Sequence, residues 1–461
     1  MRRRTGLRIA ALMAVGAMLT GCARGVAVTD DSGVDYSPSV QLGGSLRIFG
    51  FGLGDDVAQT RWDRTEQALD GVELRLTEGE LDIQQFLSAI ASGDPPDLIY
   101  ANRDQIGSFA ARGALLPLDR CIDGSGLDLG QYRPEAIEQV TFGGQVFGVP
   151  EFNQVQLTMA NADLLASEGL TLDDVNGSDW SAMRSANERL AVADGRDIAV
   201  IGIDSKLPDF FPLWAKANGA DLLSADGRTA QLDDPRVIEA LEFAVSIYAD
   251  QGGFPAVKAF RDSIDLFGEG NAYAAESIGS MPMEQWYVNV LNDVSPDVPV
   301  AFDAVRDREG EPLAFAGGSA WAIPAGATST AAACRFAVSM TSVDTWVAAA
   351  AARTAARAEE GKPFTGLLTG NAEADARIRE TIAPSGDPVW DSAVEATYLA
   401  NEHAFSAPAN PADAEFKAAW QDAVNDVLTT GAEPAEALTD AQRVAQDALD
   451  SAWAGLDEGR G

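Results

Sequence analysis

Histidine and cysteine are almost absent from this sequence, and their scarcity limits its chemistry. Among 461 residues there are three cysteines and a single histidine, His403. A structural zinc site needs four closely spaced nitrogen or sulfur ligands, and no Cys-x-x-Cys pair occurs. The glycines at 50, 52 and 54 do not have the spacing of a phosphate-binding loop either. We therefore expect neither a metal centre nor a cofactor.

Basic residues are scarce as well. The sequence has 33 lysines and arginines against 70 aspartates and glutamates, which gives a formal net charge of −37. A surface of this sign repels phosphate backbones and anionic lipid head groups, so nucleic acid is excluded as an expected partner. Because the acidic residues are spread along the chain, their simplest role is to keep the protein soluble.

Long hydrophobic runs are missing, apart from one near the start. Residues 7–19 are apolar and follow three arginines, but a bilayer span needs roughly 20 apolar residues. A basic start, a short apolar run and a small-residue end are typical of an export signal. The end of this one, Leu19-Thr20-Gly21-Cys22, resembles the lipobox of bacterial lipoproteins. That resemblance implies a lipoprotein signal peptide over residues 1–21 and lipidation of Cys22; an ordinary secretion signal is the alternative.

The polar residues that follow, 22–42, are expected to form a flexible tether. The two other cysteines are Cys121 and Cys334. Exported proteins often pair such residues, so we expect a disulfide between them. Two buried thiols are the alternative, because the sequence does not give the separation of their Cα atoms.

Short buried strands alternate with amphipathic helices over the first part of the chain. Strand patterns at 45–51, 72–76 and 97–100 are separated by helix patterns, the clearest of them at 82–90. This β-α order predicts parallel strands joined by right-handed crossovers. A second α/β pattern comes later, and from residue 331 onward the chain is mostly helical.

The stretch 141–159 has the pattern of a passage between two lobes. Gly143-Gly144 is typical of a hairpin turn, and the short strand after it is expected to end at Pro150. Alternating apolar residues from Val155 on indicate a second strand. An acid, a ring and an amide stand between the two strands, namely Glu151, Phe152 and Asn153. We predict that the chain crosses at Pro150 and that this triplet lines a ligand cleft.

Several segments, in a fixed order, carry a resemblance to a known family. They are Gly44-Ser-Leu-Arg-Ile-Phe-Gly-Phe-Gly, Ile90-Ala-Ser-Gly-Asp-Pro-Pro-Asp-Leu-Ile-Tyr, Ala110-Ala-Arg-Gly-Ala-Leu-Leu-Pro-Leu-Asp, Gly143-Gly-Gln-Val-Phe-Gly-Val-Pro, Phe267-Gly-Glu-Gly-Asn-Ala-Tyr-Ala, Gly317-Gly-Ser-Ala-Trp-Ala-Ile-Pro and Pro434-Ala-Glu-Ala-Leu-Thr-Asp-Ala-Gln. Each segment is weak alone, but the ordered set covers residues 43–455. The chain resembles the extracellular solute-binding proteins of bacterial carbohydrate ABC importers, the maltose-binding-like group.

The resemblance implies an α/β fold of the type II periplasmic binding proteins, with two α/β lobes joined by a hinge and a helical C-terminal region. Lobe 1 would hold residues 43–150 and 300–325, and lobe 2 would hold residues 151–299 and 326–461. The crossings between the lobes would lie near residues 149–153, near 298–302 and after 324. The two lobes would close on a ligand by a hinge motion.

The resemblance also places the ligand site on loops at the carboxyl ends of strands. A sugar offers hydroxyl groups and an apolar C–H face, so its site needs rings for stacking and planar carboxylates or amides. Residues of these types on the expected loops are Phe51, Asp55, Asn102, Asp104, Glu151, Phe152, Asn153, Trp286 and Trp390, with Trp214 as a weaker candidate. Structural roles are the alternative, as helix caps for the two aspartates and as core packing for Trp214 and Trp286.

The resulting hypothesis is a lipid-anchored, substrate-binding component of an ABC importer on the outer face of the cell membrane, without enzymatic activity. It would capture a mono- or oligosaccharide between its lobes as a monomer and deliver it to the permease subunits. Two alternatives stay open. An exported glycosidase would need two carboxylates about 5–10 Å apart, and a protein of the same fold could instead bind a peptide, a polyamine or a cation.

Overall fold

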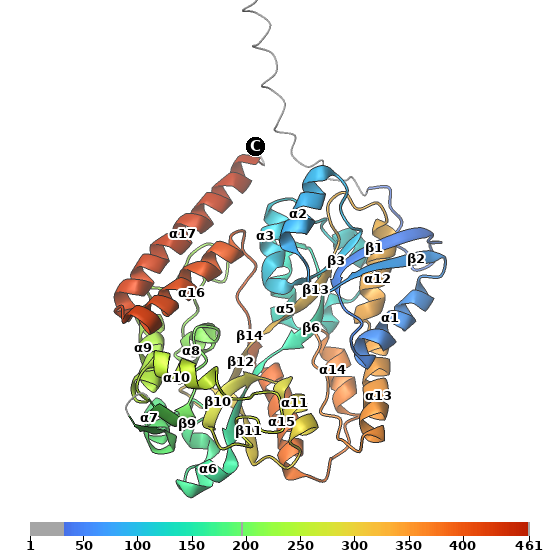
Figure 1. Cartoon of the computed structure of the whole chain (residues 1–461). Helices are drawn as coiled ribbons and strands as arrows, with labels where there is room; N and C mark the ends of the chain where they lie inside the picture. Colours follow the sequence, from blue (N-terminus) through green and yellow to red (C-terminus); the bar gives the residue numbers. More distant parts are fainter. Residues whose placement is uncertain (1–31, 195–196, 460–461) are drawn as a thin grey trace, which may run out of the picture.

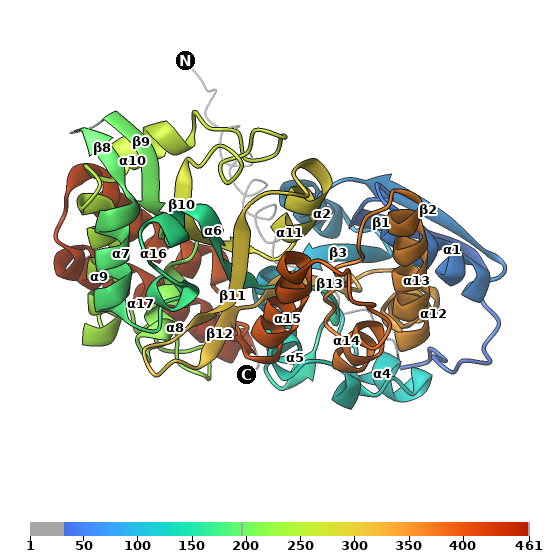
Figure 2. The ribbon, with the colours of Figure 1, turned by 90° about the horizontal axis from the view of Figure 1, so that it is seen from below.

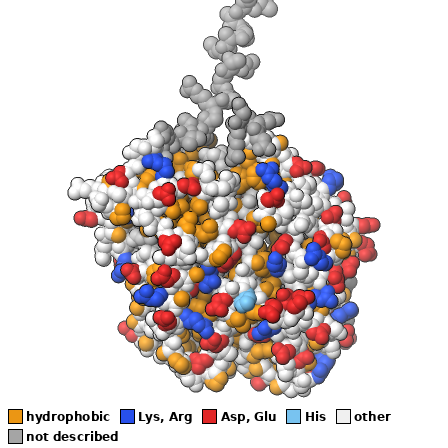
Figure 3. Space-filling view, turned by 180° about the vertical axis from the view of Figure 1, so that it is seen from behind, with side chains coloured by type: hydrophobic (Ala, Val, Ile, Leu, Met, Phe, Trp, Pro, Cys, Tyr) orange, Lys and Arg blue, Asp and Glu red, His pale blue; other side chains and the backbone are white. Residues whose placement is uncertain are grey.

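A computed structural model gives the fold of residues 32–194 and 197–459. Within these residues the chain forms two lobes, each built on its own large sheet (Figure 1; Figure 2). The signal peptide expected over 1–21 and the lipidation expected at Cys22 lie outside the described residues. On the face seen in Figure 3, acidic and basic side chains are interspersed, which agrees with a general role of the charge in solubility.

The first lobe is built around a five-stranded sheet in the order β2-β1-β3-β13-β6. Its strands are β1 (Gly44–Phe51), β2 (Val72–Glu78), β3 (Leu98–Asn102), β6 (Val149–Gln154) and β13 (Gly317–Ala322). Strand β1 pairs in parallel with β2 and with β3, which confirms the arrangement predicted from the β-α order. Strand β13 returns from the second lobe and runs antiparallel to both of its neighbours, β3 and β6.

Helices from two distant parts of the chain belong to this lobe. They are α1 (Asp56–Ala68), α2 (Ile83–Ser92), α3 (Ile106–Ala111), α4 (Asp119–Ser125), α5 (Pro134–Gln139), α12 (Thr330–Thr341), α13 (Val343–Glu359) and α14 (Ala372–Arg379). Asp55 and Asp82 accept hydrogen bonds from backbone N–H groups in the first turns of α1 and α2, so Asp55 has the capping role that was the structural alternative for it. The core joins both parts, because Ile48 of β1 packs in one buried cluster with Phe336 of α12.

The second lobe is built around a seven-stranded sheet in the order β14-β12-β11-β7-β10-β9-β8. Its strands are β7 (Gln156–Asn161), β8 (Val192–Asp194), β9 (Asp197–Ile203), β10 (Ile278–Glu284), β11 (Val300–Arg306), β12 (Pro312–Phe315) and β14 (Ala404–Phe405). The central strand β7 is antiparallel to both neighbours, β10 and β11. Its residues 156–161 are all buried, and apolar Leu157, Met159 and Ala160 alternate with or adjoin three buried polar residues.

The helices of the second lobe include the C-terminal pair. They are α6 (Ala162–Ser167), α7 (Trp180–Leu190), α8 (Phe211–Ala217), α9 (Pro235–Ala249), α10 (Phe254–Arg261), α11 (Tyr287–Val294), α15 (Pro388–Glu402), α16 (Asp413–Thr430) and α17 (Pro434–Gly459). Figure 1 shows α16 and α17 side by side at the edge of this lobe. None of the helices in the described residues has the length and apolarity that a bilayer span requires.

The first crossing between the lobes lies at Val155, later than predicted. The hairpin of β4 (Thr141–Phe142) and β5 (Gln145–Val146) forms as expected, with positive φ at Gly143 and Gly144. Pro150, however, does not end the next strand, because it lies within β6 and opposite Ala320 of β13. Strand β6 is at the edge of its sheet, where proline is tolerated because its missing N–H breaks no ladder.

The lobe boundaries predicted from the sequence need correction at two further points. Residues 300–315 form β11 and β12 of the second sheet rather than part of lobe 1, because β11 pairs with β7. The second crossing is therefore at Ala316, between β12 and β13. Residues 330–379 pack on the first lobe rather than the second, because α12 and α13 contact α1 and α14 packs on α13, so the third crossing lies between α14 and α15.

The tether predicted over 22–42 is too long at its C-terminal end. Tyr36 is buried in the core cluster of the first lobe, and Arg335 donates hydrogen bonds to the carbonyls of Ser37 and Val40. Within the same lobe, the structure joins Cys121 of α4 to Cys334 of α12 in a disulfide, with a Cα–Cα distance of 5.8 Å. This bond links segments that are 213 residues apart in the sequence.

Candidate functional site

A cavity of about 810 Å³ lies between the two lobes. Its first wall is formed by residues of α3 and α5 in lobe 1, and its second wall by residues of α8 and α16 in lobe 2. Phe315 of β12 and the segment 404–410 complete it next to the crossing strands. The two walls come from segments that are far apart in the sequence, as in many clefts of α/β proteins.

Aromatic rings form part of the second wall. Phe405 and Phe315 are partly exposed and tilted against each other, with ring centroids 5.4 Å apart. Phe416 and Trp420 of α16 line the cavity too, and both are largely buried. Phe405 therefore offers an accessible ring on which a flat apolar ligand surface can stack.

Carboxylates line both walls. Burial raises the pKa of Glu135, and burial together with repulsion from Asp221 raises that of Glu138. Across the cavity, burial and repulsion from Asp104 raise the pKa of Asp413 well above its usual value. The common cause is desolvation, which disfavours the charged form of an acid.

The lobes touch each other at the rim of this cavity. The backbone N–H of Ser108 in α3 donates to Asp413 of α16 at 3.0 Å, and Lys417 pairs with Asp104 at 3.2 Å. Gly107 lies so close to Asn410 that a Cβ atom there would be 2.5 Å from the Asn410 carbonyl oxygen. The structure thus has α3 of one lobe resting on the start of α16 of the other.

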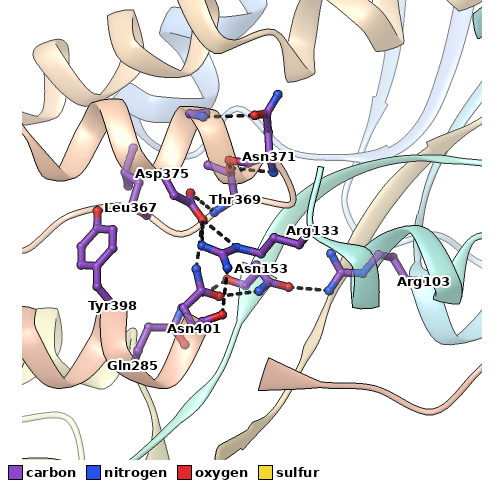
Figure 4. A network of polar contacts seen from close by, with 11 residues as sticks. Arg103, Arg133, Asn153, Gln285, Leu367, Thr369, Asn371, Asp375, Tyr398 and Asn401 are labelled. Atoms are coloured by element: carbon purple, nitrogen blue, oxygen red, sulfur yellow. Dashed lines mark hydrogen bonds and ion pairs between the residues drawn. The ribbon is translucent and has the colours of Figure 1, made fainter. Parts of the chain in front are cut away.

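A buried polar network holds the crossing segments together behind the cavity (Figure 4). Asn153 of β6 accepts a hydrogen bond from Arg103 and donates one to Asn401 of α15, both at 2.6 Å. Arg133 pairs with Asp375 at 2.8 Å and donates to the Asn401 carbonyl at 2.9 Å. Burial raises the pKa of Asp375 to about 6, although the guanidinium of Arg133 acts in the opposite direction. Arg103 also donates to the Gly317 carbonyl at 2.7 Å, so the network joins all three crossing regions.

Of the residues predicted to bind ligand, the structure places only Asp104 in the wall of the cavity. Asn102 precedes it at the end of β3 and is exposed outside that wall. The two polar side chains of the triplet after Pro150 are used inside the protein. Glu151 is fully buried and bound to Arg61 and Tyr100, Asn153 belongs to the network above, and the Phe152 carbonyl accepts from Arg103. The expectation that this triplet lines the cleft is corrected for Glu151 and Asn153, which are fully buried, and half-buried Phe152 is not part of the cavity wall either.

The predicted rings are also placed away from the cavity wall. Phe51 packs among Trp62, Tyr100 and Trp321 in the core of lobe 1. Trp214 and Trp390 are buried in lobe 2, where their indole N–H groups donate to the carbonyls of Ser205 and Pro296. Trp286 stacks on Phe267, and Asp55 caps α1 and pairs with Arg353. Large rings mostly serve packing here, because they bury the most apolar area.

Sequence reasoning missed most of the wall. The missed residues are on α5, β14 and α16 and in the segment between β14 and α16, among them Glu135, Glu138, Phe405, Asp413, Phe416, Lys417 and Trp420. The available signal was the amphipathic start of α16, where an acid, a ring and a lysine follow a loop. Within the described residues, no group of three or more histidine, cysteine or acidic side chains is placed to hold a metal ion.

Two α/β lobes, three crossings and a cavity between the lobes define a type II periplasmic binding protein fold. Residues 62–358 match the model of a family described as bacterial extracellular solute-binding proteins. This match covers more than half of the chain, so the chain belongs to that family.

Solved structures agree on the fold. CpMnBP1 with mannotriose bound is 18% identical, covers 87% of this chain and 99% of its own, and has a TM-score of 0.68. An ABC transporter solute-binding protein from Thermotoga lettingae, bound with α-D-tagatose, is 20% identical, with coverage of 88% and 100% and a TM-score of 0.65. The GacH receptor of Streptomyces glaucescens, solved unliganded and with acarbose, is 16% identical, with coverage of 89% and 99% and a TM-score of 0.67. A comparison with curated protein sequences gives no match.

Proposed function

We propose that this protein captures a carbohydrate in the cavity between its lobes. The observation that carries the proposal is the composition of the cavity wall, where the ring of Phe405 lies among carboxylates of α5 and α16. A ring stacks on the C–H face of a sugar, and carboxylates accept hydrogen bonds from its hydroxyl groups. The volume also suits a small ligand, since such sites measure about 300–1,000 Å³. The sugar ligands of the similar solved proteins support the proposal.

The remaining parts of the proposal rest on the family and on the N-terminal sequence. As an extracellular solute-binding protein, the chain would deliver its ligand to the permease subunits of an ABC importer. Lipidation of Cys22 would hold it at the outer face of the cell membrane, and it would act there as a monomer. It would bind its ligand without turnover, so nitrophenyl glycosides incubated with the pure protein should release no nitrophenol.

Titration calorimetry with a panel of mono- and oligosaccharides tests the proposed function directly. We expect binding of at least one carbohydrate, and the absence of heat with every sugar would contradict the proposal. For the sugar that binds, we expect Phe405→Ala to weaken affinity about tenfold, because a ring contact contributes about 0.5–1.5 kcal/mol beyond its buried area. Phe267→Ala is the matched control, because Phe267 is exposed and outside the cavity wall. The affinity of this variant for the sugar should equal that of the wild type.

Gly107 offers a test of lobe closure. A Cβ atom at this position would meet the backbone of Asn410 in the other lobe at 2.5 and 2.7 Å. We expect Gly107→Ala to keep α3 away from residue 410, which raises the radius of gyration in X-ray scattering with ligand present. Affinity should fall about tenfold or more, because overpacking costs about 1–3 kcal/mol.

Gly455→Ala serves as the control for this substitution, because nothing lies within 4 Å of a Cβ atom there. Both changes replace a helical glycine with alanine, so helix propensity acts in the same direction in each. An unchanged radius and affinity in Gly107→Ala would show that ligand binding does not bring these two elements together.

A further inference from the structure

The basic side chains in the cavity wall are already neutralised. Each lysine and arginine that lines the cavity in the described part of the chain has a carboxylate partner. The pairs are Lys417–Asp104, Lys216–Asp221, Arg133–Asp375 and Arg112–Glu415, with N–O distances of 3.2, 2.8, 2.8 and 3.7 Å. A negatively charged ligand would therefore find no uncommitted cation in this wall.

The acidic side chains of the wall show the opposite situation. Among the described residues, several carboxylates of the wall form no salt bridge, namely Glu135, Glu138, Asp209, Glu402 and Asp413. Asp209 and Glu402 are exposed, so water can solvate them. Glu135 and Asp413 are partly withdrawn from solvent, where an unpaired charge is costly. The wall thus holds more carboxylates than basic groups, and the carboxylates withdrawn from solvent lack a cation that would stabilise their charged form.

Glu135 is the clearest unmet acceptor. Its Oε1 atom is buried and has no hydrogen-bond partner among the residues that the structure describes. Arg103 and Arg133 attract this carboxylate, but their N–H groups are bonded elsewhere, chiefly to Asn153 and Asp375. A buried acceptor without a donor destabilises a protein unless a ligand or water supplies the donor. Glu135 lines the cavity, but Oε1 itself has no exposed surface, so a ligand donor reaches this oxygen only if the carboxylate turns toward the cavity.

Two further carboxylates, on opposite walls of the cavity, add hydrogen-bond acceptors to that of Glu135. Glu138 lies one turn along α5 from Glu135, so both project from one face of that short helix. Asp413 comes from the opposite wall, and its Oδ2 accepts from the Ser108 N–H at 3.0 Å. The Phe405 ring in this second wall already contacts a cation. The Lys216 ammonium nitrogen lies 5.3 Å from the centroid of that ring.

We propose that the carbohydrate bound in this cavity carries a protonated amine, as in an amino sugar, and that Glu135 and Glu138 select for that group. This inference rests on the proposed function and narrows its ligand class. An ammonium group has three N–H donors and a positive charge, which suits the unpaired acceptors of α5. A sugar ring next to the amine has a flat C–H face that stacks on Phe405, and a linear polyamine has no such face.

Matched sugars that differ only at one carbon test the inference. Glucosamine, N-acetylglucosamine and glucose share a skeleton, and so do galactosamine, N-acetylgalactosamine and galactose. The panel also contains the β-1,4-linked disaccharides of glucosamine, of N-acetylglucosamine and of glucose. Spermidine is added as a cation that has no sugar ring. Each compound is titrated into the purified protein by calorimetry near neutral pH, first at low salt and then at 0.5 M salt. At the higher concentration the Debye length is roughly 4 Å, so electrostatic attraction is strongly screened.

We expect a free-amine sugar to bind at least tenfold more tightly than its neutral and N-acetylated counterparts, with a preference that shrinks at high salt. Equal or tighter binding of the neutral sugars would overturn the inference while leaving the proposed function intact. Binding of no sugar at all would overturn both. Binding of spermidine alone would also overturn both, in favour of a polyamine-binding protein.

Variants then locate the selectivity. Glu135→Gln keeps the shape of the side chain and removes its charge, so the amine sugar should lose at least tenfold in affinity while a neutral sugar loses little. Glu138→Gln provides a second, more exposed site should the first variant unfold in thermal melts. Glu73→Gln is the control, because Glu73 is an exposed acid outside the cavity. An amine preference that survives both cavity variants would contradict the assignment to these residues.

Discussion

Replacing Arg61 with alanine is expected to lower the free energy of unfolding by about 3–5 kcal/mol. The side chain of Arg61 is 5% exposed and forms a salt bridge with Glu151, which is fully buried. Its guanidinium also lies 3.9 Å from the ring centroid of Trp346. Removing the arginine leaves the Glu151 carboxylate buried, with the Tyr100 hydroxyl as its one remaining side-chain donor among the described residues. An uncompensated buried charge is strongly destabilising.

Chemical denaturation of the wild type and the variant measures this loss. Arg75→Ala is the matched control, because Arg75 pairs with Glu73 on the surface and such pairs contribute only about 0–1 kcal/mol. The double variant Arg61→Met with Glu151→Leu should recover much of the lost stability, since a buried pair replaced by apolar groups of similar size is often neutral. A loss below 1 kcal/mol for Arg61→Ala would show that Glu151 is solvated or paired otherwise.

The variant Glu151→Gln decides the role of Glu151, which the sequence predicted as a ligand contact. Its stability and its affinity for the sugar are both measured. If Glu151 acts as the structure places it, Glu151→Gln lowers stability but leaves the affinity of the folded protein for its sugar unchanged. A selective loss of affinity in a stable Glu151→Gln variant would instead return Glu151 to the binding site.

Removing the Cys121–Cys334 disulfide is expected to have an effect of similar size. The bond closes a loop with a sequence separation of 213 residues and joins α4 to α12 within lobe 1. Opening such a long loop raises the entropy of the unfolded chain, and loss of a native disulfide costs about 2–5 kcal/mol. The variant Cys121→Ala with Cys334→Ala should therefore unfold at a clearly lower denaturant concentration.

Reduction of the wild type provides the second arm of this test. Dithiothreitol should lower the stability of the wild type to that of the double variant and should not change the variant itself. Equal stability of wild type and variant under oxidising conditions would show that the two thiols are unpaired in solution. The variant is also expected to bind ligand normally once folded, because neither cysteine lines the cavity.

Local features of this fold could be predicted from the sequence because they depend on neighbours in the chain. The hairpin at Gly143-Gly144 and the caps of α1 and α2 are of this kind. The parallel pairing of β1 with β2 and β3 followed from the order of strands and helices. The resemblance of ordered segments identified the family correctly, because that order spans most of the chain.

The second and third crossings could not be predicted in the same way. A strand near residue 300 fits either lobe by its apolar pattern, and only its pairing with β7 places it in lobe 2. The helix α12 likewise has an apolar face that would suit either core, and Phe336 places it against β1 and β13. Sheet order is a property of the whole chain, so short-range periodicity carries no information about it.

By itself, the sequence determined the family, the two α/β lobes and the absence of metal-binding motifs, since these depend on composition and on the order of segments. Only the tertiary structure decided which polar residues face the ligand cavity. Glu151 and Glu135 are both acids near the first crossing, yet Arg61 neutralises one inside lobe 1, and the other lines a wall opposite α16. Their roles differ because side chains from distant segments surround them, and desolvation and charge pairing act through space rather than along the chain.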